Sequence, residues 1–184
     1  MAEVIPLSQR RIDIVLVAFF VINLLFVSYL IDIEQLVIAN PAHFTYPIWP
    51  PRVVVDFVHW WGYTYDPLLI ARPVSFKVTI WLDNLLYGPF YLVAIYAYIK
   101  GKQSIRLPSI IYAVSMISGV ITILSEEAFG QYRTPHLALV VTANASWIIF
   151  PLIILFRMGL TEHPFTRPAA AVQTSMTGVA GVGR

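Results

Sequence analysis

The chain has 184 residues, of which 58% are hydrophobic and only 12% are charged, and its net charge is +2. Ordinary soluble domains carry about a quarter charged residues, so this composition and a mean hydropathy of +0.73 indicate a membrane protein. The small net charge and the lack of a long basic run exclude a nucleic-acid-binding surface. Because the chain has no cysteine, a disulfide framework and a thiolate site are also excluded, and the redox compartment stays undetermined.

The first long apolar segment predicts a membrane-spanning helix over about residues 12–33. Arg10 and Arg11 precede it, and Asp32 and Glu34 close it. A signal peptide is the alternative, but the apolar run exceeds the usual length of about 7 to 15 residues and no small-x-small cleavage site follows it. We therefore expect a helix that is retained in the protein.

Residues 34–73 form a long connection that is rich in proline and aromatic residues. A flexible loop of this length is unusual in a compact domain, so we expect it to pack. The stretch 53–61 has room for about two helical turns, and its tryptophans suit the headgroup level of a bilayer. The sequence thus predicts an aromatic-rich cap, with short interfacial helices, between the first and second spans.

Three further apolar segments predict spanning helices over about residues 73–99, 107–127 and 136–157, each near the length of about 20 residues that crosses a bilayer. The predicted fold class is therefore an all-α membrane protein, a bundle of four transmembrane helices. We expect residues 1–163 to form this domain. Residues 164–184, rich in Ala, Gly, Thr and Pro, carry too little apolar mass to pack and are expected to be a disordered cytosolic tail.

Basic residues cluster before the first span, between the second and third, and after the fourth: Arg10, Arg11, Lys100, Lys102, Arg106 and Arg157. Four spans place all three clusters on one side of the membrane, whereas three spans would divide them. The positive-inside rule makes that side cytosolic and places the cap on the lumenal side. Both termini are then expected in the cytosol.

Asp83 is the only charged residue in the stretch 78–99 of the second span. An aspartate at the centre of such a helix costs about 2.5 to 3.5 kcal/mol on insertion scales, so we expect it to face a partner or a ligand. Thr79, Asp83 and Tyr87 share one helix face at four-residue spacing. The Gly88-Pro89 pair that follows predicts a kink that frees backbone carbonyls, with a bare packing kink as the alternative.

We expect polar residues of the first, second and fourth spans to lie at similar depths in the membrane. On the fourth span, Asn144, Trp147 and Pro151 recur at helical spacing, although Asn144 could instead bond a neighbouring helix. We predict one aromatic-lined cavity whose ligand-binding residues are Asn23, Asp32, Asp66, Thr79, Asp83, Tyr87, Asn144 and Trp147.

Other roles are open for the acids of this set. Asp32 could be an interfacial helix end, and Asp66 a turn former or N-cap before Pro67. Whether Glu126 and Glu127 reach the cavity stays open. Several carboxyl groups in an apolar cavity cannot all ionise cheaply, so we expect one net negative charge, which suits a hydrophobic amine; a sterol hydroxyl would also fit.

No sequence motif for metal binding or group transfer accompanies these residues. The four histidines have no metal-ligand spacing, and nucleophile motifs, phosphate loops and dinucleotide fingerprints are absent from the sequence. We therefore predict neither a metal nor a cofactor.

The segment from Asp66 to Tyr112 resembles the sigma-2 receptor branch of the EXPERA-domain family. Its charged residues and prolines match the spacing of that branch without gaps. The string comprises Asp66-Pro67-Leu68-Leu69, Phe76-Lys77, the acid at 83, Pro89-Phe90, Ala94-Ile95-Tyr96-Ala97, Lys100-Gly101 and Ile105-Arg106-Leu107-Pro108-Ser109-Ile110-Ile111-Tyr112. The resemblance implies a four-helix protein of the endoplasmic reticulum that binds sterols or cationic amphiphiles in an intramembrane cavity.

The same resemblance suggests roles for three acids and a cellular setting. Asp32 corresponds to the amine-pairing carboxylate, Asp66 to a second acid that orders the site, and Asp83 to a position where the family usually has glutamate. The resemblance also implies a link to cholesterol homeostasis and to a sterol-transport membrane protein of the Niemann-Pick C type. The oligomeric state stays open, with a homodimer among the alternatives.

A sister branch, the emopamil-binding sterol isomerases, supplies the alternative function. The segment from Asn144 to Pro151 resembles its fourth-helix motif, but its His and Glu on the first helix are replaced by Phe19 and Asn23, which are unsuited to proton transfer. We therefore expect a binding protein rather than an enzyme. If the protein is a sterol or terpenoid double-bond isomerase instead, its catalytic acids would be Asp83, Asp32 and Glu126.

Overall fold

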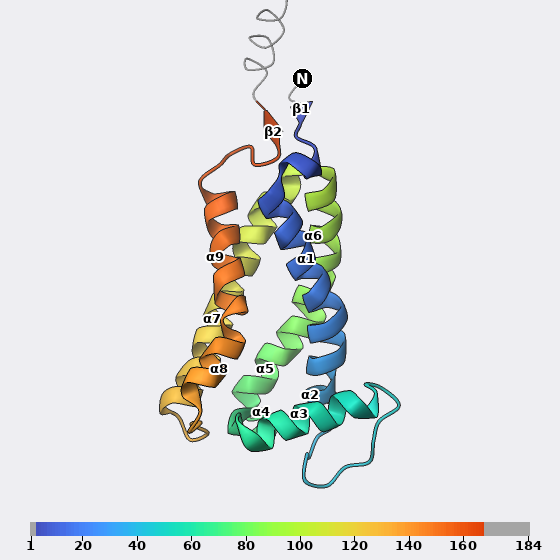
Figure 1. Ribbon diagram of the computed structural model, residues 1–184, viewed down its shortest axis with the longest axis vertical. Helices are drawn as coiled ribbons and strands as arrows, with labels where there is room; N and C mark the ends of the chain where they lie inside the picture. Colours follow the sequence, from blue (N-terminus) through green and yellow to red (C-terminus); the bar gives the residue numbers. More distant parts are fainter. Residues whose placement is uncertain (1–2, 168–184) are drawn as a thin grey trace, which may run out of the picture.

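The computed structural model describes residues 3–167 and consists almost entirely of helices. Four of them are long and apolar enough to cross a membrane, over Arg11–Val37, Val74–Lys100, Gln103–Phe129 and Leu137–Gly159. They run roughly side by side along the long axis of the molecule (Figure 1). The all-α, four-span fold class expected from the hydropathy pattern is thus confirmed, with the helices at nearly the expected positions.

Three of the four spanning helices are divided into segments of different geometry. The labels η1 and η4 denote 3-10 turns, whereas η2 and η3 are π-helical. In chain order the elements are β1 (Glu3–Val4), η1 (Leu7–Gln9), α1 (Arg11–Ile22), η2 (Asn23–Asp32), α2 (Ile33–Val37), α3 (Arg52–Thr64), α4 (Pro67–Ala71), α5 (Val74–Leu82), η3 (Asp83–Tyr87), α6 (Gly88–Lys100), η4 (Gln103–Ile105), α7 (Arg106–Phe129), α8 (Leu137–Asn144), α9 (Ser146–Gly159) and β2 (Thr166–Arg167).

The two π-helical segments hold most of the buried polar side chains of the first two spans. In η2 these are Asn23, Ser28 and Asp32, and in η3 they are Asp83 and Asn84. Proline lacks a backbone N–H, so Pro89 cannot bond the turn before it, and η3 occupies that turn. The expected disturbance at Gly88-Pro89 therefore takes the form of a wider helical turn, a geometry that recurs at functional sites.

The core is largest at the end of the bundle where the chain begins. There α1 packs on α6, and α7 packs on α9. The fully buried ring of Phe20 lies edge-on to Tyr98, with centroids 5.3 Å apart, and Phe19 stacks on Phe150 at 4.5 Å. These contacts join the first, second and fourth spans. The outward faces of the spans carry exposed aliphatic side chains, as helices in contact with lipid require.

The connection between the first two spans forms a cap. Helix α3 lies across the end of the bundle (Figure 1), where it buries Val55 and Val58 and exposes Phe57 and Trp60. The cap itself was expected, but α3 is longer than the two turns predicted for residues 53–61. A side chain on Gly62 would meet Ile70 at 2.6 Å, so glycine permits the close approach of α3 and α4.

A terminal clasp, formed by β1, β2 and Phe165, closes the opposite end. Strand β1 pairs antiparallel with β2, and the fully buried Phe165 lies edge-on to Tyr98, with centroids 5.4 Å apart. The structure therefore differs from the expected disordered tail at residues 164–167. The aromatic side chain packs because a site between α6 and the start of α1 accepts it. The rest of the expected tail, residues 168–184, lies outside the described residues.

Candidate functional site

Asp83 lies at the start of η3 with only 6% of its surface exposed. The Ser28 hydroxyl, from η2, donates a hydrogen bond to its Oδ1, and the hydroxyl of Tyr91, from α6, lies 3.5 Å from its Oδ2. Tyr91 is fully buried and its hydroxyl is 3.3 Å from that of Tyr112 on α7. Asp83 is thus held by hydroxyl groups from the first and second spans and linked through Tyr91 to the third.

Asp32, the last residue of η2, is the acidic neighbour of Asp83. It is 7% exposed, and it lies four residues after Ser28, the partner of Asp83, on η2, which packs against η3. Its hydrogen-bond partner is the Gln35 amide, at 3.5 Å. Within residues 3–167, no basic side chain forms an ion pair with Asp32 or Asp83. We call these two residues the central acid pair; it has no countercharge in the described structure.

Two other buried acids do have basic partners. Asp13 lies 2.7 Å from Arg10 and 3.1 Å from Arg157. Glu34 accepts two bonds from Nη2 of Arg72, at 2.7 and 3.0 Å, and lies 2.8 Å from Nε2 of His59. Neither network was predicted from the sequence.

Three of the predicted residues join spans through neutral hydrogen bonds. The indole Nε1 of Trp147, on α9, donates to Oδ1 of Asn23 at 2.7 Å, which connects the fourth span to the first. The hydroxyl of Tyr87 bonds that of Ser115 on α7 rather than Asp83. The predicted residues Asn23, Trp147 and Tyr87 therefore lie inside the bundle, in separate contacts around the central acid pair.

Four further predicted residues make local hydrogen bonds. Asp66 is the N-cap of α4 and accepts from Leu69 N at 2.9 Å, which is the alternative role considered for it. The others are Thr79 donating to Phe76 O at 2.7 Å, Asn144 donating to Val140 O at 2.9 Å, and Glu126 accepting from Tyr132 N at 3.2 Å. No bond joins these four side chains to the central acid pair within the described residues.

Glu127 is a further buried acid, at the cap end of α7. Its side chain is fully buried, and neither of its carboxyl oxygens has a hydrogen-bond partner within residues 3–167. Helix α4, whose N-cap is Asp66, packs against α7, so Asp66, Glu126 and Glu127 lie at the same end of the bundle. Glu127 therefore belongs to an acidic group beneath the cap, separate from the hydroxyl groups that hold Asp83.

The expected lipid-sized cavity does not correspond to either of the two prominent pockets. One pocket, with a volume of ≈ 630 Å³, lies at the terminal clasp, and the other, of ≈ 650 Å³, lies beside residues 37–45 at the cap. Neither is lined by Asp32 or Asp83. Side chains pack around the central acid pair in this structure, so a ligand there would replace some of these contacts.

Ser28 and Tyr91, the two direct partners of Asp83, were not among the predicted site residues. Tyr91 follows Thr79, Asp83 and Tyr87 at the same four-residue spacing, so one further step along the predicted face would have reached it. The position of Ser28 on the first span does indicate a membrane level similar to that of Asp83, but its contact with Asp83 depends on how the first two spans pack.

The fold and the central acid pair define a multi-pass membrane protein with buried acids inside its spanning helices. The chain belongs to the EXPERA family (EXPanded EBP superfamily), whose model matches residues 53–158. It is similar to Sigma intracellular receptor 2 of Xenopus tropicalis, with 27% identity over 119 residues that cover 59% of this chain and 70% of the relative. The protein of the same name from Homo sapiens is 31% identical over 117 residues, covering 56% of this chain and 66% of the relative. The expected membership of the EXPERA family, with likeness to its sigma-2 branch, is thus confirmed.

Proposed function

We propose that this protein binds a sterol or a hydrophobic amine at the central acid pair. The observation that carries the proposal is that Asp32 and Asp83 are buried within spanning helices, near each other and without a basic partner among residues 3–167. Ionisable residues inside a membrane are costly, and they usually mark a ligand or ion site.

An ammonium group would supply the countercharge that the structure lacks. A charge-assisted hydrogen bond is about twice as strong as a neutral one, and the rings of Tyr91 and Tyr87 could add a cation–π attraction. A sterol would use the same groups differently, because its single hydroxyl can bond a carboxyl oxygen or the Tyr91 hydroxyl. We therefore expect amine binding to depend more strongly on the two acids than sterol binding does.

Family membership supports this proposal and suggests its setting. Relatives that are similar to this chain carry the name Sigma intracellular receptor 2. We propose an endoplasmic-reticulum location with both termini in the cytosol, in keeping with the positive-inside distribution of basic residues. A role in sterol homeostasis or trafficking, together with a sterol-transport membrane protein, belongs to the same proposal.

Ligand binding by the purified, full-length protein tests the proposed site. A fluorescent lipophilic tertiary amine would be titrated against wild type, Asp32→Asn and Asp83→Asn in lipid nanodiscs. Loss of the charge-assisted bond predicts binding weaker by about tenfold or more in each variant. The matched control is Asp56→Asn, which makes the same chemical change on an exposed cap residue and should leave the affinity unchanged.

Two results would contradict the proposal. The site is wrong if Asp32→Asn and Asp83→Asn bind the amine as wild type does, and the function is wrong if wild type binds neither the amine nor a sterol. The same membranes, incubated with a sterol and assayed for a shifted double bond, test the isomerase alternative. If wild type forms a product that Asp83→Asn does not form, the protein is an isomerase rather than a binding protein.

A further inference from the structure

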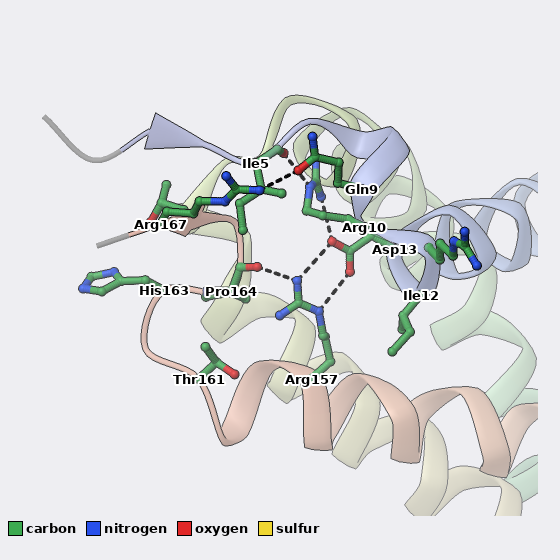
Figure 2. Close-up of a pocket in the computed structure, with 12 residues that line it drawn as sticks. Ile5, Gln9, Arg10, Ile12, Asp13, Arg157, Thr161, His163, Pro164 and Arg167 are labelled. Atoms are coloured by element: carbon green, nitrogen blue, oxygen red, sulfur yellow. Dashed lines mark hydrogen bonds and ion pairs between the residues drawn. The ribbon is translucent and has the colours of Figure 1, made fainter. Parts of the chain in front are cut away.

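The pocket of ≈ 630 Å³ at the terminal clasp has an unusually basic lining. It lies between the start of α1, the end of α9 and β2, and it is lined by four arginines, Arg10, Arg11, Arg157 and Arg167, and by one carboxylate, Asp13. Figure 2 shows Arg10 and Arg157 on either side of Asp13. The pocket lies apart from the central acid pair and has the opposite sign of charge.

Two of the four arginines form the rigid floor of the pocket. Both bond Asp13 and also reach the backbone, Arg10 through Nε to Ile5 O at 2.8 Å and Arg157 to Pro164 O. Asp13 is fully buried and Arg10 is 5% exposed. Because two guanidinium groups share one carboxylate, the floor keeps a net positive charge.

The other two arginines lie at the rim of the pocket and have unused hydrogen-bond donors. Arg167 donates one bond to Oε1 of Gln9 at 2.6 Å, which leaves most of its five N–H donors unused. The side chain of Arg11 makes no hydrogen bond or ion pair among the residues that the structure describes. Arg11 also begins α1, whose start has no side-chain cap; the acid of its first turn, Asp13, is already bonded by Arg10 and Arg157, so a further negative charge near this helix start is favourable.

The orientation of the spans does not by itself explain this arrangement. The positive-inside rule requires basic residues on one side of a membrane, but it does not require residues far apart in the chain to surround one hollow. Here β1–β2 pairing and the burial of Phe165 return residues 157–167 to the start of α1. The clasp therefore builds the pocket.

We propose that this pocket binds the phosphate group of an anionic membrane lipid. Arg11, Arg167 and the first turn of α1 would donate to the phosphate oxygens, because planar guanidinium groups match them in two-bond geometry. A lipid suits the site better than free phosphate, because the wall includes Ile5 and Ile12. Ile12 is 54% exposed at the first turn of a spanning helix, so the pocket continues into a lipid-facing surface at headgroup level.

Titration with three probes tests this proposal on the full-length protein in detergent. The probes are short-chain phosphatidic acid, diacylglycerol with the same chains, and inorganic phosphate. We expect phosphatidic acid to bind, with affinity about tenfold weaker in the double variant Arg11→Gln, Arg167→Gln. Both side chains are exposed, so the double variant should fold, which the thermal unfolding temperature would verify.

The matched control is Lys100→Gln with Lys102→Gln. It removes two positive charges from exposed residues near the same end of the bundle that do not line the pocket, and it should bind phosphatidic acid as wild type does. Equal weakening in both double variants would mean general attraction to a basic surface and would overturn the proposal. The proposal would also be overturned if diacylglycerol bound as tightly as phosphatidic acid. If inorganic phosphate bound as tightly as phosphatidic acid, the pocket would be a site for the free anion, and the lipid proposal would again be overturned.

Discussion

The buried acids near the ends of the first span differ from the acids farther inside the bundle in what faces them. Asp13 and Glu34 are fully buried, and each is bonded by arginine. Asp32 and Asp83 are nearly as deeply buried, yet hydroxyl groups and an amide are their partners among the described residues. Burial alone therefore does not decide whether an acid of this bundle has a basic partner: among residues 3–167, Asp32, Asp83 and Glu127 form no ion pair, whereas Asp13 and Glu34 do.

The physical reason for the difference is access to arginine. Arg10 and Arg157 lie at the ends of spans, and Arg72 lies just before α5, so their guanidinium groups can reach a carboxylate without entering the middle of the membrane. A basic side chain beside Asp83 would itself be costly to insert. Asp32 lies only two residues before Glu34, but its side chain faces Gln35 rather than Arg72. The difference between the two groups of acids leads to three predictions about stability.

The largest effect is expected when an arginine-paired acid loses its only arginine. Arg72→Met would leave Glu34 fully buried with His59 as its remaining partner, and breaking a buried ion pair from one side costs about 3 to 5 kcal/mol. Unfolding in detergent, followed by circular dichroism, measures the loss. Arg52→Met is the control, since its side chain is 73% exposed and should change stability by less than about 0.5 kcal/mol. Equal stability of the two variants would contradict the structural role given to Glu34.

A smaller effect is expected where two arginines share one acid. In Arg157→Met the carboxylate of Asp13 keeps Arg10 at 2.7 Å, so the loss should be about 1.5 to 3 kcal/mol, the range for hydrogen bonds to charged groups. The same unfolding experiment measures it. A loss as large as that of Arg72→Met would show that Arg10 does not compensate Asp13 by itself.

The smallest effect, of opposite sign, is expected at the central acid pair. Asp83→Asn removes a carboxyl group that has no countercharge among residues 3–167, while its amide oxygen can still accept the bond from Ser28. We expect stability to rise by about 1 kcal/mol because two neighbouring carboxyl groups no longer compete to ionise in an apolar environment, whereas Asp13→Asn should lower it. If Asp83→Asn destabilised the protein as much as Asp13→Asn, the division between the two groups of acids would fail.

The four spans and the cap could be predicted because continuous apolar runs and dense aromatics carry that information locally. The ion pairs could not, since Asp13 meets Arg157, and Glu34 meets Arg72, only after distant segments have packed. Around the predicted site, Asp83 and Asp32 were identified and do lie near each other, but Asp66, Thr79 and Asn144 bond locally instead.

Phe165 illustrates a different limit of sequence reasoning. A segment rich in small and polar residues is expected to stay unpacked when its average composition is considered. Residues 164–167 are nevertheless held, because the rest of the bundle provides a buried site for Phe165 and a strand that pairs with β2. Composition describes a segment alone, whereas packing depends on what the segment meets.

The terminal clasp makes the bundle mechanically asymmetric. At this end the first and fourth spans are tied by the β1–β2 ladder and by the pairing of Asp13 with Arg157, so they have to move together. The opposite end is joined by a small apolar cluster around Leu68, Phe76 and Ile80 and by the ion pair of Glu34 with Arg72. The ties at the clasp therefore hold the fourth span to the first, whereas the ion pair beneath the cap holds the first span to the segment just before the second.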